Sequence, residues 1–130
     1  MAGELSVTVD IRDLTAALSR LDGATRGAAL ASAVMAGGLV VEGEGKQNII
    51  RYDFIDTGAT LNSTAAREGD SSGDEAEAEI GPATEYAIFG ELGIGQSAKP
   101  FMREALESNK SAIVQAVADE LRAAIERASR

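Results

Sequence analysis

Carboxylates are the first side chains in this sequence to consider for chemistry, because the chain is rich in Asp and Glu and contains no Cys and no His. That composition removes thiolate nucleophiles, imidazole bases and the usual zinc ligands. One short string, Asp56-Thr57-Gly58, matches the signature of aspartic proteases, in which two carboxylates share a proton. The string occurs once, and proteases that pair two copies in a homodimer are rich in β-structure, whereas long helical patterns dominate here. We therefore interpret Asp56 as a turn or capping residue and expect no enzyme activity.

Neither a cofactor nor a metal ion is predicted from the other polar and glycine-rich strings. The glycines between Gly90 and Gly95 lack the following lysine and the spacing of phosphate-binding loops. Glu75, Glu77 and Glu79 alternate along an extended segment, which places their side chains about 7 Å apart. No calcium-binding loop spacing is present. We expect these three carboxylates to form a solvated or partner-facing surface.

Negative charge is concentrated in one part of the chain. The formal net charge is −9, and no basic residue occurs between Arg67 and Lys99. Tight binding to duplex DNA depends on Lys and Arg that neutralise phosphates, so the charge argues against that class of protein. The carboxylates of this acidic segment are Glu68, Asp70, Asp74, Glu75, Glu77, Glu79, Glu85 and Glu91.

The 130 residues fit one domain, which we take to span residues 1–130. The chain has no Trp, three Phe and two Tyr, so small side chains must build most of its core, and each buries little apolar area. We expect a subunit of modest stability that gains from burying surface against neighbours. We find no secretory signal and no run of about 18 apolar residues. A soluble protein made in the cytosol, with no membrane contact, is expected.

Changes of hydrophobic period divide the amino-terminal half. Alternating apolar residues predict a strand over residues 5–11, and a leucine repeat predicts a short helix over 13–21 that ends before a left-handed Gly23. A longer helix of about seven turns is expected to begin at an N-cap, Thr25. Several glycines inside it indicate either close helix packing or a break near residues 43–45.

A β-hairpin is predicted in the middle of the chain. Its first strand covers about residues 61–67, and its second places Ala76, Ala78 and Ile80 on one face and the three glutamates on the other. The residues between the strands, 68–74, are rich in Gly and Ser and are expected to form a solvated tip.

The carboxy-terminal part is expected to contain a loop over residues 90–100 and one long helix over 102–128. The predicted fold class is therefore α+β. It combines a short, mostly antiparallel sheet that includes the hairpin with two long helices packed against it.

Three motifs follow one another, with a long helix before the first and another after the last. They are Asp56-Thr57-Gly58-Ala59-Thr60-Leu61-Asn62-Ser63, Tyr86-Ala87-Ile88-Phe89-Gly90-Glu91-Leu92-Gly93 and Ala98-Lys99-Pro100-Phe101-Met102-Arg103-Glu104-Ala105-Leu106. In this order they resemble the tail-completion or head-tail joining family of long-tailed bacteriophages. Three departures are an extra residue between Gly58 and Leu61, Leu92 where the family commonly has Phe, and no proline before Asp-Thr-Gly.

The resemblance implies a structural virion protein that forms a homo-oligomeric ring at the head-tail junction or tail end. It would act as a tail-completion protein, head-tail connector or tail terminator, made in the host cytoplasm, with a six-fold ring as the default. Its partners would be its own copies and neighbouring head-completion, tail-tube or connector proteins, with genome DNA passing through without specific binding. The expected subunit or partner interface is Tyr86, Phe89, Glu91, Leu92, Gly93, Pro100 and Phe101, and the expected lumen or partner face is Glu75, Glu77 and Glu79.

Two other classes of function stay open on the residues alone. The acidic surplus is compatible with a protein-binding module or a DNA-mimic inhibitor, and the carboxylates are compatible with an enzyme. Tyr86, Phe89 and Phe101 could each also be core residues. The mass in solution separates the ring from the other two classes, because a ring has several times the mass of a monomer.

Overall fold

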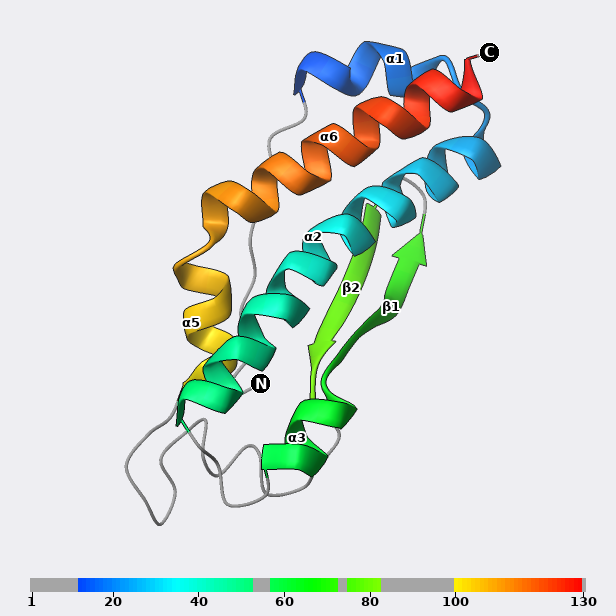
Figure 1. Ribbon diagram of the computed structural model, residues 1–130. Helices are drawn as coiled ribbons and strands as arrows, with labels where there is room; N and C mark the ends of the chain where they lie inside the picture. Colours follow the sequence, from blue (N-terminus) through cyan, green and yellow to red (C-terminus); the bar gives the residue numbers. More distant parts are fainter. Residues whose placement is uncertain (1–11, 53–56, 73–74, 83–99, 130) are drawn as a thin grey trace.

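The computed structural model describes residues 12–52, 57–72, 75–82 and 100–129 (Figure 1). The amino-terminal elements are η1 (Arg12–Leu14), α1 (Thr15–Ser19), α2 (Gly23–Tyr52) and α3 (Thr57–Ser63). The later elements are β1 (Ala65–Ser72), β2 (Glu75–Gly81), α5 (Phe101–Glu107) and α6 (Lys110–Ala128). The α+β fold class is confirmed, with a two-stranded antiparallel sheet packed against long helices. The strand expected over 5–11 lies outside the described residues.

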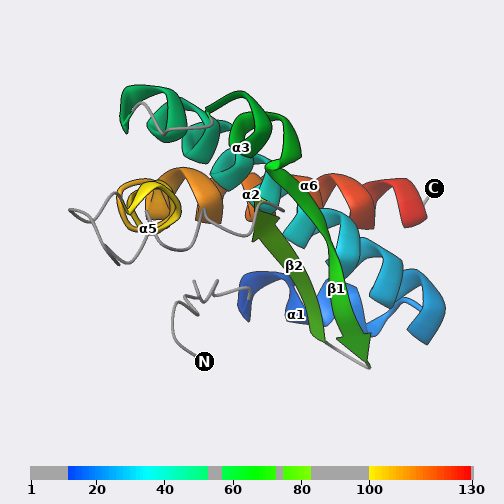
Figure 2. The same cartoon turned by 90° about the horizontal axis from the view of Figure 1, so that it is seen from below.

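The long helix α2 is the central element, and α5, α6 and the hairpin all pack against it. Figures 1 and 2 show α6 running antiparallel beside α2, with the hairpin across another side of the same helix. Leu30 and Val41 of α2 form the main core with Ile113, Val117 and Leu121 of α6. By length and composition alone α2 could also cross a membrane, with a mean hydropathy of 1.4 in its most apolar window. About a third of that window, 33%, is buried, and these residues contribute to the core.

The glycines of α2 permit close packing, and α2 is unbroken from Gly23 to Tyr52. A Cβ atom at Gly37 would lie 2.7 Å from Cγ2 of Val117 in α6. A Cβ atom at Gly45 would lie 2.7 Å from Sδ of Met102 in α5. The helix is continuous through residues 43–45, so the expected alternative of a break there is wrong. Gly37 and Gly45 instead bring α6 and α5 close to α2.

The start of α2 differs from the prediction in its capping residue. Gly23 is the first residue of the helix and does not terminate the preceding one. Asp22 caps α2 instead of Thr25: its Oδ1 accepts the Thr25 backbone N–H at 2.8 Å and its Oδ2 accepts the Thr25 hydroxyl at 3.0 Å. Both bonds stabilise the charged carboxylate and so lower the pKa of Asp22, and the bond from the Thr25 backbone has the larger effect.

The first strand of the hairpin begins later than predicted, because residues 57–63 form the short helix α3. Leu61 packs against the cluster of Ile49 and Phe101, which holds this turn against the end of α2. The chain then enters β1 and continues in it to Ser72, so residues 68–72 are strand where a flexible tip was expected. Pairing places Ala66 opposite Ile80, with an irregularity in the register between Glu68 and Ser71.

The carboxy-terminal helix is divided in two, and the prediction of one helix over 102–128 is wrong in this respect. Residues 108 and 109 separate α5 from α6. The Asn109 side chain donates to the Ala105 carbonyl at 2.9 Å, which satisfies one of the unpaired acceptors at the end of α5. The two segments pack on different parts of α2, because Ala105 lies near Gly45 whereas Ile113 and Val117 lie near Gly37.

Candidate functional site

The acidic face of the hairpin is formed as predicted. Glu75, Glu77 and Glu79 are exposed on β2, and the intervening residues are half-buried. Ala78 and Ile80 lie over Gly38, where an added Cβ would be 3.4 and 3.6 Å from them. The alternation follows from the two-residue period of a strand, one face of which packs on α2.

The three glutamates have no ion-pair partner within 4.0 Å among the residues that the structure describes. Arg67 stands opposite Glu79 in the register of the hairpin without forming a salt bridge. Alternate side chains on one strand lie about 7 Å apart, so their charges repel one another. This face can therefore attract a basic surface or repel a polyanion.

Of the residues predicted to form the interface in the second and third motifs, the structure describes Pro100 and Phe101. Tyr86, Phe89, Glu91, Leu92 and Gly93 lie outside the described residues. Pro100 has a φ of −78° and directly precedes α5, in agreement with the expectation that it fixes the start of the last helical region.

The side chain of Phe101 is a core residue. It is only 1% exposed and packs with Ile49, with Tyr52, Leu61 and Met102 around this pair. The core interpretation of Phe101 therefore holds for the single chain, and its predicted contact with another subunit stays a prediction. Its residue type suits both roles, since a large aromatic ring fills an interface as well as an interior.

A polar cluster beside Phe101 joins the end of α2 to α5. Asn48 donates to the Phe101 carbonyl at 2.9 Å, and both Tyr52 and Arg51 donate to the Glu104 carboxylate. The Tyr52 hydroxyl, and after it Arg51, lower the pKa of Glu104. The Arg51 guanidinium also lies 4.9 Å from the centre of the Tyr52 ring. Sequence reasoning missed this cluster, because its residues are about 50 positions apart and no local pattern links them.

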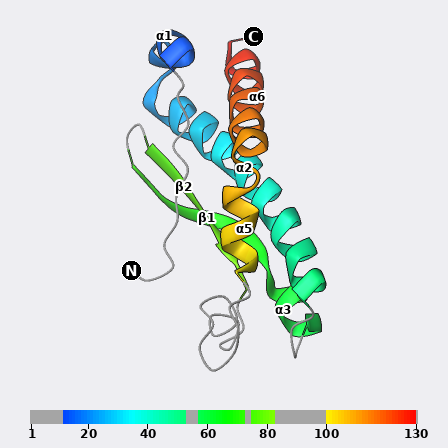
Figure 3. The ribbon, with the colours of Figure 1, turned by 90° about the vertical axis from the view of Figure 1, so that its left-hand side faces the viewer.

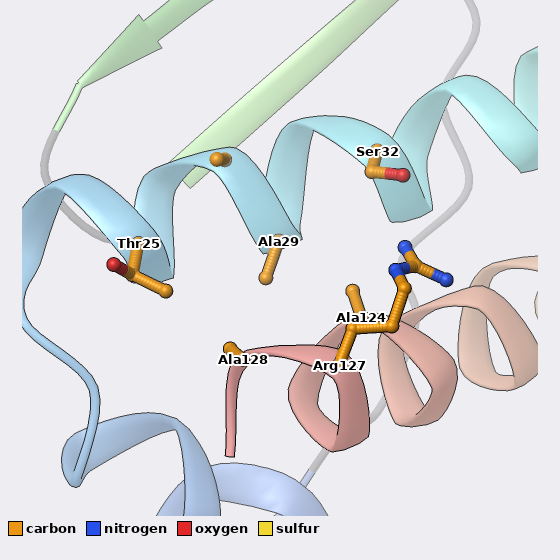
Figure 4. A pocket seen from close by; sticks show the side chains of 7 residues that line it. Thr25, Ala29, Ser32, Ala124, Arg127 and Ala128 are labelled. Atoms are coloured by element: carbon orange, nitrogen blue, oxygen red, sulfur yellow. The ribbon is translucent and has the colours of Figure 1, made fainter. Parts of the chain in front are cut away.

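A shallow groove lies where the start of α2 meets the end of α6 (Figure 4). It has a volume of about 290 Å³, and two of its lining side chains, Ser32 and Arg127, both bond to the Glu120 carboxylate. Glu120 accepts from Ser32 at 2.8 Å and from Arg127 at 2.7 Å, and these bonds, Arg127 first, lower the pKa of Glu120. The lining residues are Thr25, Ala28, Ala29, Ser32, Ala124, Arg127 and Ala128.

The carboxylates beside the groove and in the polar cluster already have partners. Glu120 and Arg127 neutralise each other, and Glu104 is held by two donors. Within residues 12–52, 57–72, 75–82 and 100–129, no group of three or more carboxylates could hold a metal ion. The acidic face of β2 is therefore the principal candidate for function.

Comparisons with protein families, with curated proteins and with solved structures give no match to this chain.

Proposed function

We propose that this chain is a structural subunit of a long-tailed bacteriophage and assembles into a ring at the head-tail junction or the tail end. The observation that carries the proposal is the order of the three sequence motifs, from Asp56-Thr57-Gly58 to Pro100-Phe101, between two long helical regions. A ring made of one kind of chain uses two different surfaces on each subunit, because each copy contacts the next one head to tail.

The composition of the core supports an assembling subunit. Two of the five largest fully buried side chains are Thr60 and Thr64, and Phe101 is the largest. Helices joined through glycine and alanine bury less apolar area than helices joined through large side chains. Contacts with neighbouring copies would then supply stability that the isolated chain lacks.

The acidic face gives the ring a role in DNA passage. Glu75, Glu77 and Glu79 form an exposed row without ion-pair partners in the described part of the chain. Repeated around a channel, this row would repel the phosphate backbone and keep genome DNA from adhering to the wall. On an outer or axial surface, the same row would instead attract a basic neighbour.

The proposal is tested by the mass and shape of the purified protein, with and without isolated tail tubes. We expect negative-stain images of rings, and light-scattering masses several times the monomer mass of 13.4 kDa, at least when tubes are present. A chain that stays monomeric both in concentrated solution and inside assembled particles would overturn the proposal.

An acidic binding module or DNA mimic is the second candidate, favoured by the same row of carboxylates. It would bind a basic protein one to one without forming rings. Pull-down of a basic, DNA-binding protein by the monomeric chain, abolished by Glu75→Gln, Glu77→Gln and Glu79→Gln together, would support it.

A further inference from the structure

The hairpin has one strand edge that the described part of the chain leaves open. Ala66 of β1 lies opposite Ile80 of β2, but its N–H donates to the Glu42 carboxylate of α2 at 2.7 Å and not to β2. An antiparallel pair that exchanges no hydrogen bonds directs its backbone groups to the outer edges of the two strands. Glu42 therefore covers the outer edge of β1 at Ala66, whereas no described residue bonds to the outer edge of β2.

The polar groups at the open edge follow from the same register. Backbone groups alternate along a strand, so Ala78 and Ile80 direct their N–H and C=O groups outward, and Glu79 between them directs its own toward β1. Pro82 follows the strand and has no N–H, so the row of outward donors ends at Ile80. An exposed edge with unpaired backbone groups is where a further strand adds to a sheet.

The side chains at this edge determine which strand fits. Ala78 and Ile80 are half-buried and lie over Gly38 of α2. Residues that lie opposite each other in a sheet point their side chains to the same face. A strand that bonds to Ala78 and Ile80 therefore turns the side chains of its bonding residues toward α2, where apolar residues are favoured.

Residues 5–11 have the pattern that this edge requires. Their apolar residues are Leu5, Val7, Val9 and Ile11, and a polar residue separates each from the next. The segment has seven residues, as many as β2, and its valines and isoleucine favour extended backbone. An isolated two-stranded hairpin is marginally stable, and a third strand with an apolar face adds to its stability.

We propose that residues 5–11 pair with the open edge of β2 as a third, antiparallel strand. The segment leads into Arg12, and the next residue, Asp13, is held to Arg122 of α6 at 3.3 Å. Figures 1 and 3 show that β2 begins at the end of the hairpin nearer to α1 and runs away from it. A segment that runs along β2 toward Arg12 therefore has the opposite direction. Figure 2 shows the start of this helical stretch on the β2 side of the hairpin.

Charge and tethering favour this segment over a second copy of the chain. The β2 strand of another copy would bring three glutamates beside those already present, and like charges opposite each other destabilise a sheet. On the side that would face these glutamates, residues 5–11 carry Ser6, Thr8 and a single charge, Asp10. A segment joined to the subunit at Arg12 also acts at an effective concentration of about a millimolar, above that of free chains in dilute solution.

The third strand goes beyond the proposed ring and does not depend on it. It covers the edge at which copies of the chain could otherwise add strands to one another. It leaves the carboxylates of β2 on the solvent face, because its own α2-facing side chains lie on the other face of the sheet.

Hydrogen exchange of single backbone amides, followed by NMR on the unmodified chain, tests the pairing. With an open edge, exchange is slow at Glu79, which bonds to β1, and fast at Ala78 and Ile80. With the third strand, all three amides exchange slowly. We expect the second pattern, together with nuclear Overhauser effects between the backbone protons of Ala78 or Ile80 and those of residues 5–11.

A proline in the segment provides the matched comparison. Val7, with its side chain toward α2, would donate its N–H to β2, and Val7→Pro removes that donor. The Ala78 and Ile80 amides should then exchange about tenfold faster or more, whereas the control Ala2→Pro should leave them unchanged. Slow exchange at Glu79 in both variants shows that the hairpin is folded.

Three results would overturn the third strand. They are fast exchange at Ala78 and Ile80 in the unmodified chain, slow exchange there that Val7→Pro leaves unchanged, and slow exchange that is lost when the unmodified chain is diluted. The last result would assign the edge to a second copy. A protected edge in a chain that never forms rings would overturn the ring proposal alone.

Discussion

Single residues decide how closely the helices of this chain approach one another. The glycines of α2 have identical side chains but different surroundings. Gly37 and Gly45 touch α6 and α5, Gly38 touches the hairpin, and Gly43 faces open space. Their effects on folding should therefore differ in sign.

Alanine substitution separates these glycines. Gly43→Ala should raise the free energy of unfolding by about 1 kcal/mol, because it improves helix propensity without meeting any atom. Gly37→Ala should lower it by about 1–3 kcal/mol, since the new methyl group would overlap the stiff, buried Val117. Urea denaturation of both variants at low protein concentration measures the difference. Equal destabilisation by the two substitutions would contradict the packing described for α2.

Phe101 is expected to act on stability and not directly on assembly. Phe101→Ala should cost about 3–5 kcal/mol, because it opens a cavity beside Ile49. Phe101→Leu, which keeps much of the volume, should cost less and serves as the control. Thermal melting of the isolated subunit checks both values. If Phe101→Ala melts normally but does not assemble into rings, Phe101 acts at the subunit interface, as the motif predicts.

The elements of the chain were predicted well where one periodic pattern extends over a whole segment. The long helix, the alternation in β2 and the short helix after residue 12 follow from local patterns. The predictions failed where tertiary contacts decide between local alternatives. Leu61 draws residues 57–63 into a helix against Ile49 and Phe101. Apolar residues keep the same helical spacing before and after Ser108 and Asn109, so the pattern alone does not show where α5 ends.

The attachment of α5 to α2 should depend on pH through Glu104. The bonds from Tyr52 and Arg51 lower the pKa of Glu104, so the carboxylate contributes stability above its unfolded pKa of about 4.3. That contribution is lost as the pH falls through the lower pKa of the folded state. The unmodified chain should therefore be more stable than Glu104→Gln at pH 7, and the difference should shrink as the pH falls below about 4.

Urea midpoints at several pH values, measured for both chains, follow this difference. Glu107→Gln is the matched control, because Glu107 is an exposed carboxylate of the same helix. A difference between the unmodified chain and Glu104→Gln that is independent of pH would show that the ionised carboxylate does not stabilise the contact.

On the scale of the whole molecule, charge and packing are distributed over different sides of α2. The hairpin presents its glutamates to solvent, and its alanines and Ile80 pack against the helix. The acidic face was predictable, because alternation on a strand needs no knowledge of its neighbours. The side of α2 that packs against α5, α6 and the hairpin was not, because the sequence does not show which side of a largely apolar helix the other elements cover.

The acidic face is tested by changing Glu75, Glu77 and Glu79 together to Gln, which removes three negative charges and keeps the size and polarity of the side chains. If the row lines a channel, particles should assemble normally and deliver their genome more slowly, because the wall no longer repels phosphate. That is the result we expect. The measurement is the rate of DNA release from purified particles, alongside particle counts by electron microscopy.

The matched control combines Glu44→Gln in α2, Glu107→Gln in α5 and Glu126→Gln in α6. It changes the net charge by the same amount but at positions on three different helices. It should leave DNA release unchanged, because the effect depends on charge density along one strand and not on total charge. Heads and tails that fail to join in the β2 variant alone would place the acidic row against a basic neighbouring protein. Wild-type titre and normal release in the β2 variant would eliminate both roles and leave a hairpin whose glutamates serve only its solubility.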